Sequence, residues 1–129
     1  MRYFIFLILI SLVLLSGCGP TGNITADLEK NSIKSGSTTT LTINGKNTGD
    51  SVANFFVRIT PEDSTKVVVT YPRPLEYTLD PNEEIGDKII NVQAFTDYTS
   101  TTYNILVELV NSEDGKVVDK SLKQITVNK

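Results

Sequence analysis

The sequence predicts an all-β fold, a single antiparallel β-sandwich of seven or eight strands over residues 24–129. From Asn23 onward, apolar residues recur at every second position, and no window of about ten residues carries the apolar stripe of a helix. The region is rich in threonine, valine and isoleucine, whose branched side chains favour strands. Turn signals recur about every 8 to 14 residues, which is typical of a sandwich without crossover helices.

The first four expected strands carry apolar residues at alternate or successive positions. They cover residues 24–28, 38–47, 53–59 and 67–69. Lys30-Asn31 ends the first strand, and residues 61–64 (Pro-Glu-Asp-Ser) form a turn after the third. The valine run 67–69 fits either a strand buried on both faces or an edge strand. Residues 31–37, with Lys30 and Lys34, are expected to form a guarded sheet edge.

Two short motifs fall around the end of the second strand. Asn44-Gly45 could make a tight hairpin, but that leaves strands of awkward length before Val52, so we prefer a bulge there. In the segment 47–50 (Asn-Thr-Gly-Asp), the asparagine side chain can bond the backbone two residues on. Gly49 is expected to supply a positive φ in this turn.

The last four expected strands cover residues 75–79, 85–95, 103–109 and 116–127. Residues 80–82 (Asp-Pro-Asn) end the first of them. The second is apolar at Ile85, Ile89 and Val92, although Gly86-Asp87 indicates a late start or a bulge. Tyr103 begins the penultimate strand, where a tyrosine corner is expected. Residues 111–115, ending in Asp-Gly, form the last hairpin loop.

Composition excludes several kinds of function. The chain has no histidine and one cysteine, so it lacks the residues for a thiol–imidazole pair, a serine triad or a zinc site of the usual ligands. A net charge of −3 argues against binding nucleic acid. We therefore expect no enzyme activity and no cofactor.

The N-terminal segment has the pattern of a secretory signal. Arg2 precedes an apolar run over residues 4–15, which is too short as a helix to cross a bilayer of about 30 Å. Residues 15–18 (Leu-Ser-Gly-Cys) resemble the lipobox of prokaryotic lipoproteins. The resemblance implies a signal peptide over residues 1–17, a lipidated Cys18 with a tether over 18–23, and an extracytoplasmic, membrane-anchored domain. The alternative is an uncleaved anchor helix with an idle cysteine.

Three further stretches resemble CARDB-type and related immunoglobulin-like (Ig-like) domains of bacterial and archaeal cell-surface proteins. They are residues 40–54 around Asn-Thr-Gly, residues 79–83, and residues 103–107 together with Asp114-Gly115. In residues 79–83, Asn82 stands where these domains usually have glycine, and asparagine also accepts positive φ. The resemblance implies an Ig-like β-sandwich after a cleaved signal peptide, acting as a non-enzymatic adhesion, spacer or binding module.

Two aromatic segments are candidate partner contacts. Residues 71–77 carry two tyrosines around a proline-flanked arginine, the composition of an interface anchor; the alternative is a rigid connection whose tyrosines pack on the core. Residues 95–103 combine aromatic rings with hydroxyls, which suits sugars as well as a plain surface loop. The predicted contact residues are Tyr71, Arg73, Tyr77, Phe95 and Tyr98.

An acidic cluster is the remaining candidate site. Its four carboxylates could bind calcium or hold a general acid–base pair, but their spacing matches no EF-hand loop and a solvated turn explains them as well. The cluster comprises Asp80, Glu83, Glu84 and Asp87. Asn23-Ile24-Thr25 also meets the N-glycosylation pattern.

The sequence as a whole thus predicts a membrane-anchored interaction or spacer module for another cell-envelope protein. A surface polysaccharide is the alternative ligand, and a calcium-dependent adhesion module is a further one.

Overall fold

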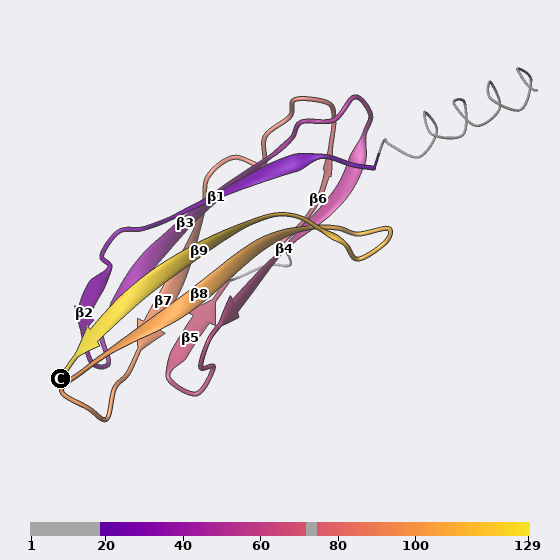
Figure 1. Ribbon diagram of the computed structural model, residues 1–129. Coiled ribbons are helices and arrows are strands. Elements are labelled where there is room, and N and C mark those ends of the chain that lie inside the picture. Colours follow the sequence, from indigo (N-terminus) through magenta and orange to yellow (C-terminus); the bar gives the residue numbers. More distant parts are fainter. Residues whose placement is uncertain (1–18, 72–74) are drawn as a thin grey trace, which may run out of the picture.

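The computed structural model describes residues 19–71 and 75–129. These residues form two packed sheets of β-strands with no helix between them (Figure 1). The strands are β1 (Gly22–Leu28), β2 (Ser32–Lys34), β3 (Thr38–Asn47), β4 (Ala53–Pro61), β5 (Val67–Thr70), β6 (Glu76–Leu79), β7 (Lys88–Ala94), β8 (Ser100–Asn111) and β9 (Val117–Asn128). The predicted all-β sandwich is confirmed, with nine strands in the described residues where seven or eight were expected.

The two sheets have the orders β1-β3-β7-β5 and β2-β9-β8-β4-β6. Every pair of neighbouring strands is antiparallel except β2 and β9, which run parallel. β2 has only three residues and lies at an edge of the five-stranded sheet, within the segment 31–37 that was expected to form a guarded edge. The valine run of β5 is the edge strand of the other sheet.

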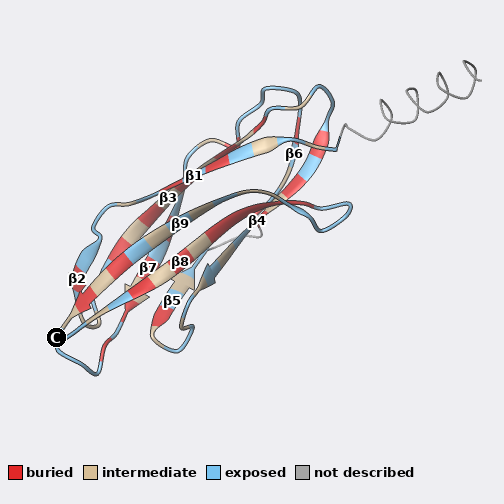
Figure 2. Ribbon diagram, viewed as in Figure 1, coloured by how far each residue is buried: buried red, intermediate tan, exposed pale blue. Residues whose placement is uncertain are grey.

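The core lies between the sheets and is built from alternate residues of the strands, as Figure 2 shows by its bands of buried residues. Inward side chains are apolar and outward ones are mostly polar, the pattern of sheets that are solvated on one face. The largest fully buried side chains are Phe55, Leu41, Ile43, Ile90, Ile105, Leu109 and Ile125. Burial of these aliphatic side chains and of the Phe55 ring stabilises a core that contains neither tryptophan nor a disulfide.

In β7, the residues that face the core differ from those that the sequence predicts. It starts late, at Lys88, as Gly86-Asp87 indicated, but Ile89 points outward and is 67% exposed, whereas Ile90 and Val92 are buried. The reason is Gly86, whose φ of +80° re-aims the chain between Ile85, which is buried, and the strand proper.

β3 also corrects an expectation, because Asn44-Gly45 makes neither a hairpin nor a bulge. β3 pairs with β1 in unbroken register from Gly22 opposite Asn47 to Leu28 opposite Leu41. Gly45 instead leaves room for the tip of the Ile85 side chain, since a Cβ there would lie 2.8 Å from Cδ1 of Ile85.

The sandwich has two ends that matter for function. At one end, which we call the near end, residues 19–21 lead into β1 and meet the loop 48–52, where the Thr48 amide donates to the Thr21 carbonyl at 3.0 Å. The loop 80–84 lies beside the end of β3, where the Asn82 amide donates to the Asn47 carbonyl at 2.8 Å. At the far end lie the loops 35–37, 62–66 and 95–99 and the last residue, whose amide donates to the Thr99 carbonyl at 3.0 Å (Figure 1). The described residues contain no helix able to span a membrane. The predicted signal peptide and Cys18 lie outside the described residues.

Candidate interaction surfaces

The predicted contact residues fall in two separate places. Phe95 and Tyr98 lie in the far-end loop between β7 and β8, whereas Tyr71 follows β5 and Tyr77 lies in β6. Arg73 lies outside the described residues. The aromatic side chains therefore do not form one platform.

The far-end loop, residues 95–99, presents Tyr98 on a braced turn, which we call the Tyr98 turn. Tyr98 is 73% exposed, while its backbone amide donates to Oγ1 of Thr96 at 3.1 Å. Thr96 is buried, and its own amide donates to Oγ of Ser35 at 3.0 Å. A further hydrogen bond of 2.7 Å joins the hydroxyls of Thr96 and Thr101. These bonds order the backbone beneath Tyr98 before any partner arrives.

The predicted tyrosine corner supports the same turn. The buried Tyr103 at the start of β8 donates from its hydroxyl to the carbonyl of Phe95 at 3.1 Å, eight residues upstream. Beside it, Lys66 forms an ion pair with Asp97, and the hydrogen bond that its ammonium donates to the Asp97 carboxylate raises the pKa of Lys66 above its ordinary value. The Tyr98 turn is thus tied to the loop that follows β4.

Tyr71 and Tyr77 lie on the flank where β5 and β6 end the two sheets. The Tyr71 ring is 43% exposed. Tyr77 stands opposite Phe55 in β4 and packs partly against the core, and burial raises the pKa of its hydroxyl. Tyr77 is therefore mainly a packing residue, as the alternative interpretation of this segment expected, while Tyr71 remains accessible.

The near end contains the Asn-Thr-Gly motif. The buried Asn47 accepts a hydrogen bond from the Gly49 amide at 2.9 Å through its side-chain oxygen, as predicted. Gly49, however, does not have the expected positive φ; a Cβ there would lie 3.2 Å from Oδ1 of Asn47, so its role is to leave room. Asn82 does have a positive φ, of 64°.

The four acidic residues of the cluster are all exposed. Glu83 uses its carboxylate locally, accepting a hydrogen bond from the Asp80 amide at 2.7 Å. Among the residues that the structure describes, no group of three or more potential metal ligands gathers. This geometry favours the solvated turn over the calcium site.

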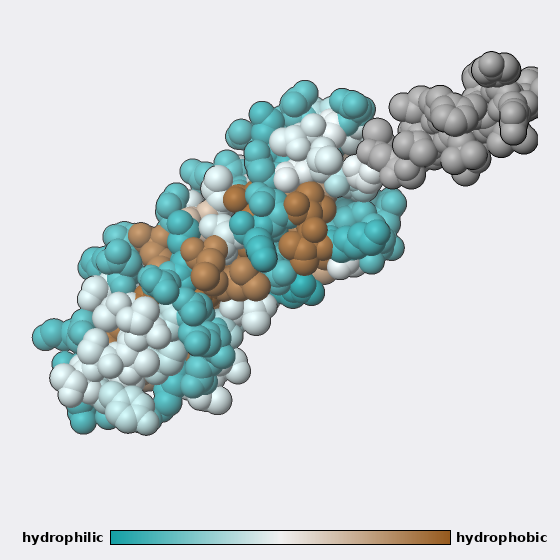
Figure 3. Space-filling view, in the orientation of Figure 1, coloured by the Kyte–Doolittle hydropathy of each residue, from teal (hydrophilic) through white to brown (hydrophobic). Residues whose placement is uncertain are grey.

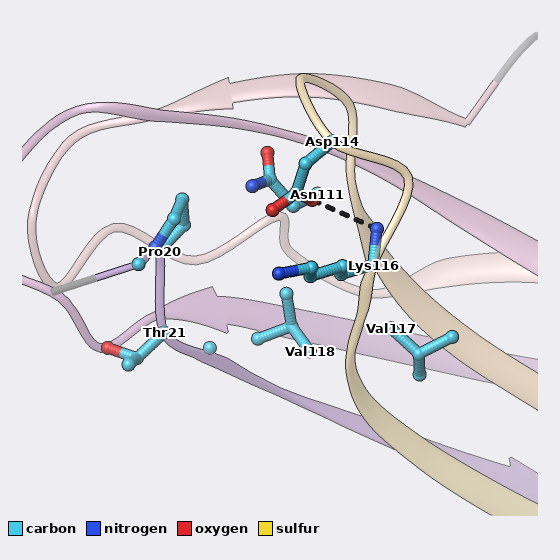
Figure 4. Close-up of a pocket in the computed structure, with 9 residues that line it drawn as sticks. Pro20, Thr21, Asn111, Asp114, Lys116, Val117 and Val118 are labelled. Carbon is cyan, nitrogen blue, oxygen red and sulfur yellow. Dashed lines mark hydrogen bonds between the residues drawn. The ribbon is translucent and has the colours of Figure 1, made fainter. Parts of the chain in front are cut away.

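A shallow pocket of about 460 Å³ opens at the near end, between residues 19–22 and the β8–β9 hairpin (Figure 4). Lys116 and Val118 point toward its centre, and the Lys116 amide donates to Oδ1 of Asp114 at 2.9 Å. The pocket brings no catalytic pair together, since its lining holds one lysine, one aspartate and otherwise neutral residues.

One feature of the five-stranded sheet was not predicted from the sequence. On its outer face, Nε of Arg58 donates to Oε1 of Glu108 at 2.9 Å, and Glu108 is only 8% exposed. This hydrogen bond and the charge of Glu108 raise the pKa of Arg58. Hydrophobic side chains such as Leu122 emerge on the same face, and Figure 3 shows hydrophobic patches along the middle of the molecule. Arg58 stands at an outward-facing position of its alternating strand, and this position is the sequence signal that could have predicted the ion pair.

Comparisons with known proteins show the fold. No family model matches the sequence, and no curated protein matches it either. Among 61 chains of solved structures that are similar is the CARDB domain of a Pyrococcus furiosus protein, solved in complex with di-metal ions. It is 16% identical with a TM-score of 0.54, over 84% of this chain and 92% of that one.

Two more similar structures come from larger chains. Escherichia coli alpha-2-macroglobulin is 20% identical with a TM-score of 0.56, over 81% of this chain but only 6% of its own. A sporulation control protein of Bacillus subtilis is 15% identical with a TM-score of 0.60, over 87% of this chain and 51% of its own. At these identities the similarity concerns the fold alone, and the chain has a CARDB-like, Ig-like β-sandwich fold.

Proposed function

We propose that this chain is a membrane-anchored surface lipoprotein whose Ig-like domain is a non-enzymatic interaction module for another cell-envelope protein. Lipid on Cys18 would hold the domain at a membrane, because two acyl chains anchor stably where one does not. Confinement to that thin layer raises the effective concentration of any partner in the same membrane.

The observation that carries the proposal is the position of the Tyr98 turn relative to the start of β1. β1 begins at Gly22, so residues 19–21 alone separate it from Cys18 and reach at most about 10 Å. A lipid on Cys18 therefore brings the near end to the bilayer, and the far end faces away from it. The most exposed aromatic ring of the described residues, Tyr98, then points toward other envelope components on a preorganised backbone.

The anchor is tested by replacing Cys18 with serine in the full chain. The unaltered protein is expected to gain the mass of a diacylglyceryl group and to partition into detergent, and Cys18→Ser to do neither. An unaltered protein without lipid, or one that keeps residues 1–17, contradicts the anchoring proposal.

The contact is tested by photo-cross-linking in cells, with p-benzoylphenylalanine placed at Tyr98. Ile89, which is about equally exposed but lies on the outer face of β7, gives the matched control. A recurrent protein partner captured at position 98 and not at 89 supports the interaction module. Equal, diffuse labelling at both positions contradicts it.

Surface polysaccharide is the second candidate ligand, because the Tyr98 ring and nearby hydroxyls suit stacking and hydrogen bonding with sugars. Phe95, which is 38% exposed, is the only other predicted contact in that loop. Retention on envelope polymer that falls at least tenfold in Tyr98→Ala, with an unchanged thermal midpoint, supports this alternative. Unchanged retention excludes it.

A further inference from the structure

We infer that the free edge of β5 receives an extended strand from a protein partner and pairs with it through backbone hydrogen bonds. This inference rests on the proposed function as an interaction module, but not on the lipid or on the Tyr98 turn. It concerns the flank where Val67–Thr70 ends the four-stranded sheet.

β1, β2 and β6 are the other terminal strands of the two sheets in the described residues, and each of them is protected. Along β1, the Ile24 amide donates to Oδ2 of Asp119 in β9 at 2.9 Å, and Asp27 lies 3.8 Å from Nζ of Lys123. These contacts cover β1 with the neighbouring sheet. β2 has only three residues, and one of them is Lys34; β6 has four, and one is Glu76. Short length and charged residues are the usual protection of an edge.

β5 is as short as β6, with four residues, but its sequence Val-Val-Val-Thr contains neither a charged residue nor a proline. Val68 is 43% exposed on its outer side. An uncharged, β-branched edge strand is the kind of edge that pairs with another chain. The contrast with the other three edges singles out β5 as the one suited to strand addition.

The register of β5 shows which backbone groups face outward. The Phe95 amide of the β7 side donates to the Lys66 carbonyl at 2.8 Å. Because hydrogen-bonding direction alternates along an antiparallel strand, residues 68 and 70 also face β7, and Val67 and Val69 face away. The Val67 amide donates to the Asp63 carbonyl at 2.9 Å. Within residues 19–71 and 75–129, the Val67 carbonyl and both backbone groups of Val69 have no partner strand and lie on the outer side of β5.

The core is incompletely covered on the same flank. Three of the apolar side chains that pack only partly against the core belong to the strands bordering it: Ile59 of β4, Val69 of β5 and Tyr77 of β6. β1 and β9 close the opposite flank, so an added strand beside β5 would shield apolar surface that the two sheets leave exposed. The partner segment is therefore extended, about four residues long, and apolar and β-branched on its inward face.

The test uses the full chain in cells, with p-benzoylphenylalanine at Val68, whose side chain would lie about 5 Å from that of a paired residue. Val69→Pro removes the outward amide, and proline is tolerated at an edge position whose amide faces solvent. Val69→Ala is the matched control, because it also removes the valine side chain but keeps the amide. Val69→Lys, which aims a charge inward at the edge, is the second blocking variant. Thermal midpoints show which variants fold.

We expect one recurrent protein cross-linked at position 68, a yield at least tenfold lower in Val69→Pro and Val69→Lys, and a yield within about twofold of the parent in Val69→Ala. If Val69→Pro fails to fold, the cross-linking yield of Val69→Lys is compared with that of Val69→Ala, and the same difference is expected. Equal losses in all variants, or cross-links only to a second copy of this chain, overturn the inference.

The probe at Tyr98 separates this inference from the proposed function. A partner captured at position 98 but not at 68 overturns strand addition and leaves the interaction module standing. Capture of a protein at neither position contradicts both.

Discussion

The side-chain amide of Asn47 donates a 2.9 Å hydrogen bond to the backbone carbonyl of Leu79, 32 positions later in the chain. A second bond from the same amide nitrogen reaches the Ser51 carbonyl at 2.9 Å, and the side-chain oxygen accepts from Gly49. One buried side chain thus ties the end of β3 to the loop before β4 and to the end of β6. Because Asn47 is fully buried, water cannot replace these bonds.

Asn47→Ala is expected to destabilise the domain by roughly 3 kcal/mol, since it removes three side-chain bonds and takes the side-chain donor from the carbonyl of the buried Leu79. Asn44→Ala, three residues earlier on the same strand, is the matched control, because the Asn44 side-chain oxygen is buried without a partner. It should change stability by no more than about 0.5 kcal/mol. Urea unfolding of both variants measures the difference, and equal losses would contradict the role given to Asn47.

Much of the fold was predictable because its signals are local. Alternating apolar residues marked the longer strands, and Asn47 and Tyr103 each make the bond expected from their position. β2 lies in the segment expected to form a sheet edge, but its bounds and its parallel pairing were not predictable, because three residues carry no period and their partner, β9, lies far along the sequence. The inward set of β7 depends on the φ of Gly86, which a sequence pattern does not specify.

Tyr103→Phe is expected to cost about 1 kcal/mol, the usual net value of one hydrogen bond, because its ring stays in place while the Phe95 carbonyl loses its donor. Tyr98→Phe is the control, since the Tyr98 ring is exposed. Thermal unfolding should show a lower midpoint for the first variant only. A similar midpoint for both variants would mean that the tyrosine corner does not stabilise the turn.

The candidate sites were less predictable than the fold, because strand order and strand pairing decide which residues become neighbours. The sequence grouped Tyr71, Tyr77, Phe95 and Tyr98 by composition, but two of them border the β5–β6 flank and two lie at the far end. The free edge of β5 is likewise a property of strand order, since a run of three valines fits a central strand equally well.

Gly22→Ala is expected to destabilise the domain by about 1 to 3 kcal/mol through overpacking. A Cβ at Gly22 would lie 2.8 Å from both Cδ2 of Leu109 and the backbone oxygen of Lys46, and that backbone is held in the β1–β3 pairing. Gly19→Ala is the control, because a Cβ there meets nothing within 4 Å. Denaturant midpoints should fall for Gly22→Ala and stay level for Gly19→Ala; the reverse order would refute the packing argument.

Asp63 should make the stability of the domain depend on pH in acid. Hydrogen bonds from the Thr65 hydroxyl, at 2.6 Å, and from the Thr65 amide, at 2.9 Å, hold the pKa of Asp63 below its ordinary value of 3.8. A lowered folded-state pKa gives stability that is complete above the unfolded value and is lost as the pH falls through the folded one. The advantage of the parent over Asp63→Asn should therefore be constant near neutral pH and shrink as the pH falls below the unfolded-state pKa and through the lowered folded-state pKa.

Thr65→Val identifies the cause of that pH dependence, because it removes the hydroxyl donor while keeping the shape of the side chain. Since the hydroxyl bond is the largest contribution to the lowered pKa of Asp63, this variant should lose part of the acid dependence, whereas Asp63→Asn should lose all of it. Urea unfolding at a series of pH values measures both. Parallel pH profiles for the parent and Asp63→Asn would show that the turn after β4 contributes nothing to acid unfolding, and that the loop carrying Lys66 is held at the far end by other contacts.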